Sequence, residues 1–384
     1  MSLTWQADRF HCLGHNGYAL LVCPVAGGGP AIFPVPALIL SAVWLPDQSG
    51  LLSTIGGQIW LQPFPKGPLQ RITNDADDYW QLAVTSDGKR LSAVQARRQT
   101  TLIVGPASDP DKATPINATN FNGIGFNSIG LAWRPDGKLL LNDKNSQFWL
   151  LSDNGHDRVP VFRLDGNLFP GSFSMCDGGH LLVLNRFTQN KESTVWRADS
   201  TGGNLVQLTK GPSDNFPDCS PDGKSLIYAR DADNKEVLVK VPISGGSPQI
   251  LFKDHYLARY SPDGSRIAIL YEEGEGKNAV RKIGVMDSEG HILKRFDYNG
   301  EPPNEGRQWL LRWTSDGLGL AYTMTQNGNE AANVWFQPIS GGNARQITHF
   351  PDSVINLAWS PDGKRVALIR LAVSSDLVLF RDFR

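Results

Sequence analysis

Aspartate is the residue type whose spacing in this sequence could most readily support chemistry, because eight aspartates recur in one short turn context. They are Asp47, Asp87, Asp136, Asp177, Asp222, Asp263, Asp316 and Asp362. Carboxylates that lie close together can act as general acid and base or hold a divalent cation. Successive copies are 40 to 53 residues apart, however. We therefore expect each aspartate to shape its own hairpin turn, far from the other seven.

A second set of polar and aromatic residues lies in the segments that would join one repeated unit to the next. The residues concerned are Asp77, Asp78, Tyr79, Trp80, Asp214, Asn215, Asp254, His255, Arg307, His349 and Asp352. Gathered at one mouth of a channel, they would form a mildly acidic rim suited to a cation, a basic peptide segment or a polyhydroxylated ligand. They are also ordinary turn and capping residue types. The sequence leaves both interpretations open.

Histidine and cysteine were considered as metal ligands. His255 and His349 lie in comparable junctions, but two histidines do not complete a ligand set, and the other five lie in unrelated positions. The spacings of Cys12, Cys23, Cys176 and Cys219 match no zinc or redox motif. We predict no cofactor or metal, and we interpret Cys176 and Cys219 as small core residues rather than a bridge.

Motifs of hydrolases and phosphate-binding enzymes are missing. No G-x-S-x-G nucleophile motif occurs. Glycine-rich stretches at 123–128 and 274–279 precede no helical pattern, so they are interpreted as loop tips. The sequence therefore predicts a protein that is not an enzyme. Lys plus Arg (37) nearly equals Asp plus Glu (38), which argues against a nucleic-acid partner.

The aspartates are positioned by a repeated hairpin, seen clearly in Ala358–Ile369. Pro361 presets its own φ, Gly363 can take a positive φ, and Asp-Gly between apolar runs is a strong hairpin signal. In five of the eight copies an aromatic residue stands three residues before the aspartate, as Trp359 does before Asp362. The pattern indicates two antiparallel strands around each turn.

The repeat continues beyond the hairpin. A second aromatic-rich strand, a glycine turn and a short final strand follow, as in Val334–Phe336, Gly341–Gly342 and Gln346–Thr348. Four short strands repeating every 40 to 50 residues are typical of propeller blades. No helical periodicity competes with this reading.

These motifs resemble the WD-like repeat of TolB and its relatives, and the resemblance covers roughly residues 18–384. It implies an all-β fold: one propeller over 18–384 with eight four-stranded blades, or seven as the alternative. Residues 1–17 form an irregular N-terminal segment. The last unit lacks a fourth strand, so we expect an N-terminal strand near Ala31–Val35 to close the ring.

Stretches 42–52, 71–75, 312–317 and 375–384 resemble the C-terminal propellers of bacterial membrane-anchored serine/threonine kinases. This resemblance implies a monomeric, extracytoplasmic sensor domain that binds an unidentified protein, peptide or small-molecule ligand at one face. The chain shows no signal peptide and no apolar run long enough to enter a membrane. Two alternatives stay open. Some TolB-like propellers are metal-dependent pectin lyases, and others assist envelope assembly.

Overall fold

The computed structural model describes residues 11–15, 19–24, 29, 31–36, 39–75, 77–116, 130–143, 146–155, 157–164, 169–188, 192–232, 235–274, 279–301, 310–326, 331–381 and 383. The described chain is built from β-strands and two short 3-10 helices, η1 (Pro110–Lys112) and η2 (Asp177–Gly179). It divides into two compact units. Unit 1 comprises residues 1–99 and 372–384, and unit 2 comprises residues 100–371. We describe each unit separately.

Five sheets of unit 2 are each made from four consecutive antiparallel strands. They are β11 (Leu131–Trp133), β12 (Leu139–Asn142), β13 (Gln147–Leu151) and β14 (Arg158–Arg163); β15 (Phe169–Cys176), β16 (Leu181–Phe187), β17 (Ser193–Asp199) and β18 (Val206–Gln207); β19 (Asp214–Cys219), β20 (Ser225–Ala232), β21 (Lys235–Pro242) and β22 (Gln249–Lys253); β23 (His255–Tyr260), β24 (Arg266–Glu273), β25 (Val280–Asp287) and β26 (Ile292–Asp297); and β27 (Leu311–Trp313), β28 (Gly319–Met324), β29 (Asn333–Pro338) and β30 (Arg345–Gln346).

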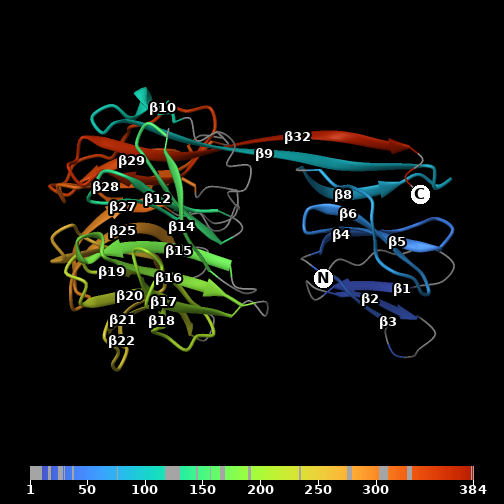
Figure 1. The fold of residues 1–384 in the computed structure, drawn as a ribbon, viewed down its shortest axis with the longest axis horizontal. Helices are drawn as coiled ribbons and strands as arrows, with labels where there is room; N and C mark the ends of the chain where they lie inside the picture. The colour runs from blue at the N-terminus through green and yellow to red at the C-terminus, as the bar shows by residue number, and fades with distance from the viewer. Residues whose placement is uncertain are drawn as a thin grey trace. The chain divides into compact units, whose positions relative to one another are not determined.

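The sixth sheet of unit 2 combines two distant parts of the chain. It runs β31–β32–β9–β10, where β31 is Ser353–Trp359, β32 is Arg365–Arg381, β9 is Arg90–Pro106 and β10 is Thr114–Pro115. Both long strands, β9 and β32, continue from one unit into the other (Figure 1). Within unit 2, Ile103 of β9 is fully buried against Leu357, Val366 and Leu368. The sheet therefore has a normal apolar core although its strands are far apart in sequence.

The first strands of the six sheets form a closed cycle. Contacts join β31 to β11, and then β15, β19, β23 and β27 in turn. The last gap is spanned by a hydrogen bond from Arg312 Nη2 on β27 to Asn356 Oδ1 on β31, at 3.2 Å. Tryptophan indoles also cross between sheets, since Trp133 donates to Ala358 O and Trp313 donates to Arg259 O. Unit 2 is thus a ring of six blades around the six inner strands.

Unit 1 contains the remaining strands. The sheet β4–β7 has four strands, β4 (Ile39–Trp44), β5 (Gly50–Ile55), β6 (Gln58–Pro63) and β7 (Gln70–Arg71). A three-stranded sheet is formed by β1 (His11–His15), β2 (Ala19–Pro24) and β3 (Ala31–Pro34), while β8 (Asp78–Val84) pairs with β9. Leu52, Ile59, Tyr79 and Leu91 are among the core residues of this unit.

The predicted all-β, multi-blade propeller is confirmed, and two details differ from the sequence expectation. The ring in unit 2 has six blades rather than eight, because the first repeats lie in unit 1. Ala31–Pro34 pairs with β2, and the position beside β32 is taken by β9. The sequence did not predict the pairing of β9 with β32. The 17 residues of β9 have the pattern of the second strand of an ordinary repeat, and that pattern does not indicate a distant partner strand. The single domain over residues 18–384 stays a prediction.

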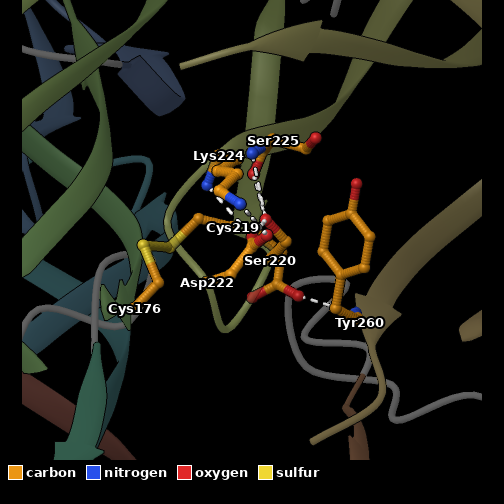
Figure 2. The surroundings of a disulfide bond; sticks show 8 residues. Cys176, Cys219, Ser220, Asp222, Lys224, Ser225 and Tyr260 are labelled. Atoms are coloured by element: carbon orange, nitrogen blue, oxygen red, sulfur yellow. Dashed lines mark hydrogen bonds and ion pairs between the residues drawn. A yellow bond between two sulfur atoms is a disulfide. The ribbon is translucent and has the colours of Figure 1, made fainter. Parts of the chain in front are cut away.

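The cysteine prediction was wrong. Cys176 and Cys219 form a disulfide with a Cα–Cα distance of 5.9 Å, a spacing that suits such a bond. Both are the last residues of inner strands, and in the following strands Cys176 is opposite Leu181 and Cys219 is opposite Leu226. Because β15 and β19 are neighbours in the ring, equivalent end residues face each other. Figure 2 shows this bond beside the turn that contains Ser220 and Asp222. Both cysteines are nevertheless buried, as expected.

The prediction for the repeated aspartates is confirmed. Asp222 Oδ1 accepts hydrogen bonds from Ser220 Oγ at 2.6 Å and from Lys224 N at 3.1 Å, as Figure 2 shows. The Ser220 hydroxyl bond, with the backbone bond, lowers the pKa of Asp222. Asp263 and Asp362 make the same pair of bonds in their own turns. These carboxylates are therefore local turn-forming groups.

Candidate functional site

A cavity of about 430 Å³ lies at the centre of unit 2, where the inner strands end and the Asp-Gly turns begin. All six blades contribute to its lining. The residues are Leu131, Ala132, Trp133, Pro135, Phe173, Ser174, Met175, Cys176, Gly178, Gly179, Asp218, Cys219, Pro221, Arg259, Tyr260, Ser261, Pro262, Arg312, Trp313, Ser315, Ala358, Trp359, Ser360 and Pro361. Because every inner strand reaches it, this cavity is central to the ring, and its size is that of a small-molecule pocket.

At one equivalent position of the six inner strands, the side chain that lines the cavity differs in chemical type from blade to blade. It is the penultimate residue of each inner strand, identified by its antiparallel partner in the next strand. We call it the channel position. Around the ring it is occupied by Ala132, Met175, Asp218, Arg259, Arg312 and Ala358. Three consecutive blades thus supply a carboxylate and two guanidinium groups, while the other three supply apolar side chains.

Arg259 is buried, with 8% of its surface exposed. Its Nη1 donates to the carbonyl oxygen of Ala258 at 2.8 Å and, more weakly, to that of Phe216 at 3.4 Å. Burial lowers the pKa of the Arg259 guanidinium, and the charge of Asp218 acts in the opposite direction. Among the described residues, its Nε and Nη2 groups have no hydrogen-bond acceptor. The edge of the guanidinium suited to bidentate binding of an oxyanion is therefore open.

Arg312 is on the neighbouring inner strand. Its Nη1 donates to Leu311 O at 3.0 Å and its Nη2 to Asn356 Oδ1 at 3.2 Å. Burial, followed by repulsion from the charge of Arg259, lowers the pKa of Arg312 to about 9. The group is still protonated at pH 7. The positive charges of Arg259 and Arg312 therefore repel each other inside the ring.

Asp218 is the one carboxylate at a channel position. It is 7% exposed, and its Oδ2 accepts a hydrogen bond from Tyr260 N at 2.8 Å. Within the described part of the chain, no ion pair joins Asp218 to Arg259 or Arg312. The channel positions therefore carry two positive charges against one negative charge.

The predicted rim residues of unit 2 lie at or just before the starts of the inner strands, as expected from their junctions. Asp214 is fully buried and binds Arg230 through two hydrogen bonds of 2.7 and 3.0 Å. Asp352 forms the corresponding ion pair with Arg370. Asp254 pairs with Lys235 at 3.0 Å on the surface. These carboxylates have protein partners, and their contact with a ligand stays a prediction.

The other polar residues predicted for this rim have different surroundings. Asn215 Oδ1 accepts a hydrogen bond from Asn185, and His349 contacts Asp111 through both its backbone N–H and its ring. His255 is 2% exposed, and burial lowers its pKa to about 4, so its imidazole is neutral at pH 7. Arg307 lies outside the described residues.

The first predicted junction belongs to unit 1. Asp77 is bound by Arg97 and Gln95, and Asp78 pairs with Arg98. Buried Tyr79 donates its hydroxyl to Asp75, and burial raises the pKa of Tyr79 to about 12. The guanidinium of Arg98 also lies 5.1 Å from the ring centre of Trp80, which is 36% exposed.

The described residues contain no group of three or more histidine, cysteine or acidic side chains arranged to hold a metal ion. They also contain no helix with the length and apolar character needed to cross a membrane.

The sequence analysis did not identify Asp218, Arg259 and Arg312 as site residues, because it sought candidates in the junctions and insertions, where the repeats differ in length. The signal was nevertheless present. Each of the three residues stands four residues before an Asp-Gly aspartate, next to the aromatic or cysteine position. A comparison of that position across the repeats, instead of the junctions, would have shown arginines in two successive copies at a position that is otherwise largely apolar.

The chain has a TolB-like β-propeller fold. A protein described as TolB from Agrobacterium tumefaciens superposes with a TM-score of 0.56 and 19% identity, covering 72% of this chain and 99% of that one. An oligogalacturonate lyase from Vibrio parahaemolyticus gives a TM-score of 0.46 and 10% identity over 85% of this chain and 88% of that one. No family model matches the chain.

In sequence, the chain is 30% identical over 111 residues to the uncharacterized peptidase YuxL of Bacillus subtilis. That match covers 28% of this chain and 16% of the length of the peptidase. At 19% identity, the similarity to the Agrobacterium tumefaciens protein shows the fold alone, and function has to be argued from the site.

Proposed function

We propose that the chain is a ligand-binding propeller without catalytic activity of its own, and that its ligand occupies the central cavity of unit 2. The observation that carries this proposal is the set of charges at the channel positions, where Asp218 and Arg259 are buried and Arg312 is half-buried. Buried charges with incomplete partners are costly for stability, and they are typical of sites that recognise a ligand.

We further propose that the propeller is the extracytoplasmic sensor part of a larger signalling protein, as its resemblance to kinase-linked propellers implies. The disulfide between Cys176 and Cys219 supports this location, because disulfides persist mainly in oxidising compartments. Fusing alkaline phosphatase, which is active only outside the cytoplasm, to the C-terminus of the natural full-length protein tests the location. An inactive fusion would contradict it.

Binding is tested by blocking the cavity. Ala358 occupies a channel position, and Ala358→Phe places an aromatic ring where the wild type has a methyl group. A panel of charged and uncharged metabolites is screened by thermal shift on both proteins. We expect at least one compound to raise the melting temperature of the wild type and not that of a folded Ala358→Phe variant.

Turnover separates binding from catalysis. The compound that binds is incubated with the purified wild-type protein, with and without added Mn²⁺, and its consumption is followed by mass spectrometry. We expect the compound to stay unchanged. Its cleavage would favour the alternative, a lyase or hydrolase acting in the channel, while equal binding by the Ala358→Phe variant would place the site elsewhere.

A further inference from the structure

The charge of the central cavity points to the class of its ligand, and this inference rests on the binding function proposed above. Arg259 and Arg312 occupy equivalent positions on adjacent inner strands, β23 and β27. The backbone at Arg259 is held from the next blade, because Trp313 Nε1 donates to its carbonyl oxygen at 3.0 Å. The Arg259 guanidinium therefore projects from a backbone position held by the next blade, and the Arg312 guanidinium is itself bonded across to Asn356 of the blade after it.

The protein supplies these two cations with few acceptors. Asp218 is the one acidic side chain at the channel positions, and one of its oxygens already accepts the Tyr260 N–H. Within the described residues, the two guanidinium groups donate to three backbone carbonyls and to the side-chain oxygen of Asn356. Hydrogen bonds to neutral carbonyls do not cancel a charge. One net positive charge is left at the channel positions.

The walls around these charges are apolar and aromatic. Trp133, Trp313 and Trp359 line the cavity, together with Phe173 and Met175. Such walls suit an organic body rather than an inorganic ion, since burying aromatic and aliphatic surface contributes most of the binding free energy in small-molecule pockets.

We propose that the central cavity of unit 2 binds a small organic carboxylate, whose oxygens accept hydrogen bonds from the guanidinium groups of Arg259 and Arg312. Arginine presents its Nε and Nη2 donors in a fork that matches the two oxygens of a carboxylate. A monoanion balances the single excess charge, whereas a dianion such as a phosphate monoester would leave an excess negative charge beside Asp218. The aromatic walls contact the rest of the ligand.

The test is a thermal-shift and titration-calorimetry series on the full chain. The probes are monocarboxylates of increasing size, from acetate to benzoate, each compared with its neutral amide, and inorganic phosphate is a further probe. Ionic strength is held constant with NaCl, so that general salt effects are the same in every sample. We expect a saturable rise in melting temperature with at least one monocarboxylate and no rise with the corresponding amide.

Variants then assign the binding to the two arginines. Arg259→Met and Arg312→Met remove one charge each and keep similar length, and each should weaken carboxylate binding at least tenfold. Arg345→Met is the matched control, because Arg345 is an exposed residue of β30 that stacks on Phe336. It should bind like the wild type. If a Met variant does not fold, Arg259→Lys or Arg312→Lys keeps the charge but loses the fork, and should still weaken binding.

Several results would overturn the proposal. They are no rise with any carboxylate of the series, an equal rise with the amides, or equal carboxylate binding by the Arg259→Met and Arg312→Met variants. Stronger binding of phosphate than of every carboxylate would also overturn it. Failure of this kind is distinct from failure of the binding function. If the cavity-blocking Ala358→Phe change abolishes binding of an uncharged compound, the site stands and the ligand class is wrong.

Discussion

The ion pair between Asp214 and Arg230 provides a direct test of whether the junction carboxylates are structural groups. Asp214 is fully buried, whereas the side chain of Arg230 is 31% exposed. The carboxylate also accepts a hydrogen bond from Gly211 N at 3.1 Å. Asp214→Asn keeps the shape of the side chain and removes its charge. In the wild type, the hydrogen bonding that Arg230 donates to the buried Asp214 carboxylate is the largest contribution that raises the pKa of Arg230.

The magnitude follows from burial. Removing one partner of a fully buried ion pair typically costs about 3–5 kcal/mol. Arg230 is about one-third exposed, so water can solvate its guanidinium once the carboxylate charge is lost. We therefore expect a loss of about 2–3 kcal/mol in the free energy of unfolding. For a unit of this size that corresponds to a fall in melting temperature of roughly 4–10 °C.

The matched control is Asp254→Asn. Asp254 pairs with Lys235 at the surface, where both side chains are largely exposed, and such a pair contributes less than about 1 kcal/mol. Asp254 has a φ of 57°, and asparagine tolerates this left-handed conformation, so the substitution adds little backbone strain.

Urea denaturation followed by tryptophan fluorescence and far-UV circular dichroism measures both variants against the wild type. The shift in midpoint at unchanged slope gives the loss in stability. If Asp214→Asn shifts the midpoint no more than Asp254→Asn does, the pair of Asp214 with Arg230 does not hold its blade together, and the reasoning from burial is wrong.

Two further predictions concern other buried groups of unit 2. His255 has a pKa of about 4 in the folded protein, below its ordinary value of 6.5, so the unfolded chain binds more protons between these values and stability must fall as the pH drops from 6.5 to 4. The loss is roughly 3 kcal/mol, and His255→Phe should flatten the pH dependence of the urea midpoint while the exposed-site change His180→Asn should not. The Cys176–Cys219 disulfide closes a loop across 43 residues, so replacing both cysteines by alanine should cost about 2–4 kcal/mol. Non-reducing peptide mapping checks that the bond is present, and equal stability of oxidised and dithiothreitol-reduced wild type would contradict its role.

The hairpins could be predicted from the sequence because their determinants are local. Ser220, Asp222, Lys224 and Ser225 form their hydrogen bonds within five residues of each other, and the same bonds recur in the copies around Asp263 and Asp362. Such short-range bonds depend on residue type and spacing alone. The strand pattern and the propeller fold follow from repeating this unit.

The closure of the ring could not be predicted in the same way. It depends on β9 lying beside β32, although their residues are more than 250 positions apart in the chain. A pattern of apolar residues shows that a strand is buried, and it does not name the partner. The disulfide also depends on a contact that is distant in the sequence. It forms because β15 and β19 are neighbours in the ring, and no cysteine spacing motif indicates it.

The candidate site shows that comparing the residue type at one equivalent position of the repeats can locate a binding site better than comparing the lengths of their loops. Ala132 and Ala358 show that a small apolar side chain fits the channel position. Placing arginine there on two adjacent strands removes two guanidinium groups from water and sets them against each other, which costs several kcal/mol. Apart from the hydrogen bond of Arg312 with Asn356, the described scaffold does not depend on these two side chains, because the turns are held by their own aspartates and the blades by apolar contacts. A bound anion accounts for both arginines at once. It supplies the acceptors and the negative charge that the described ring does not.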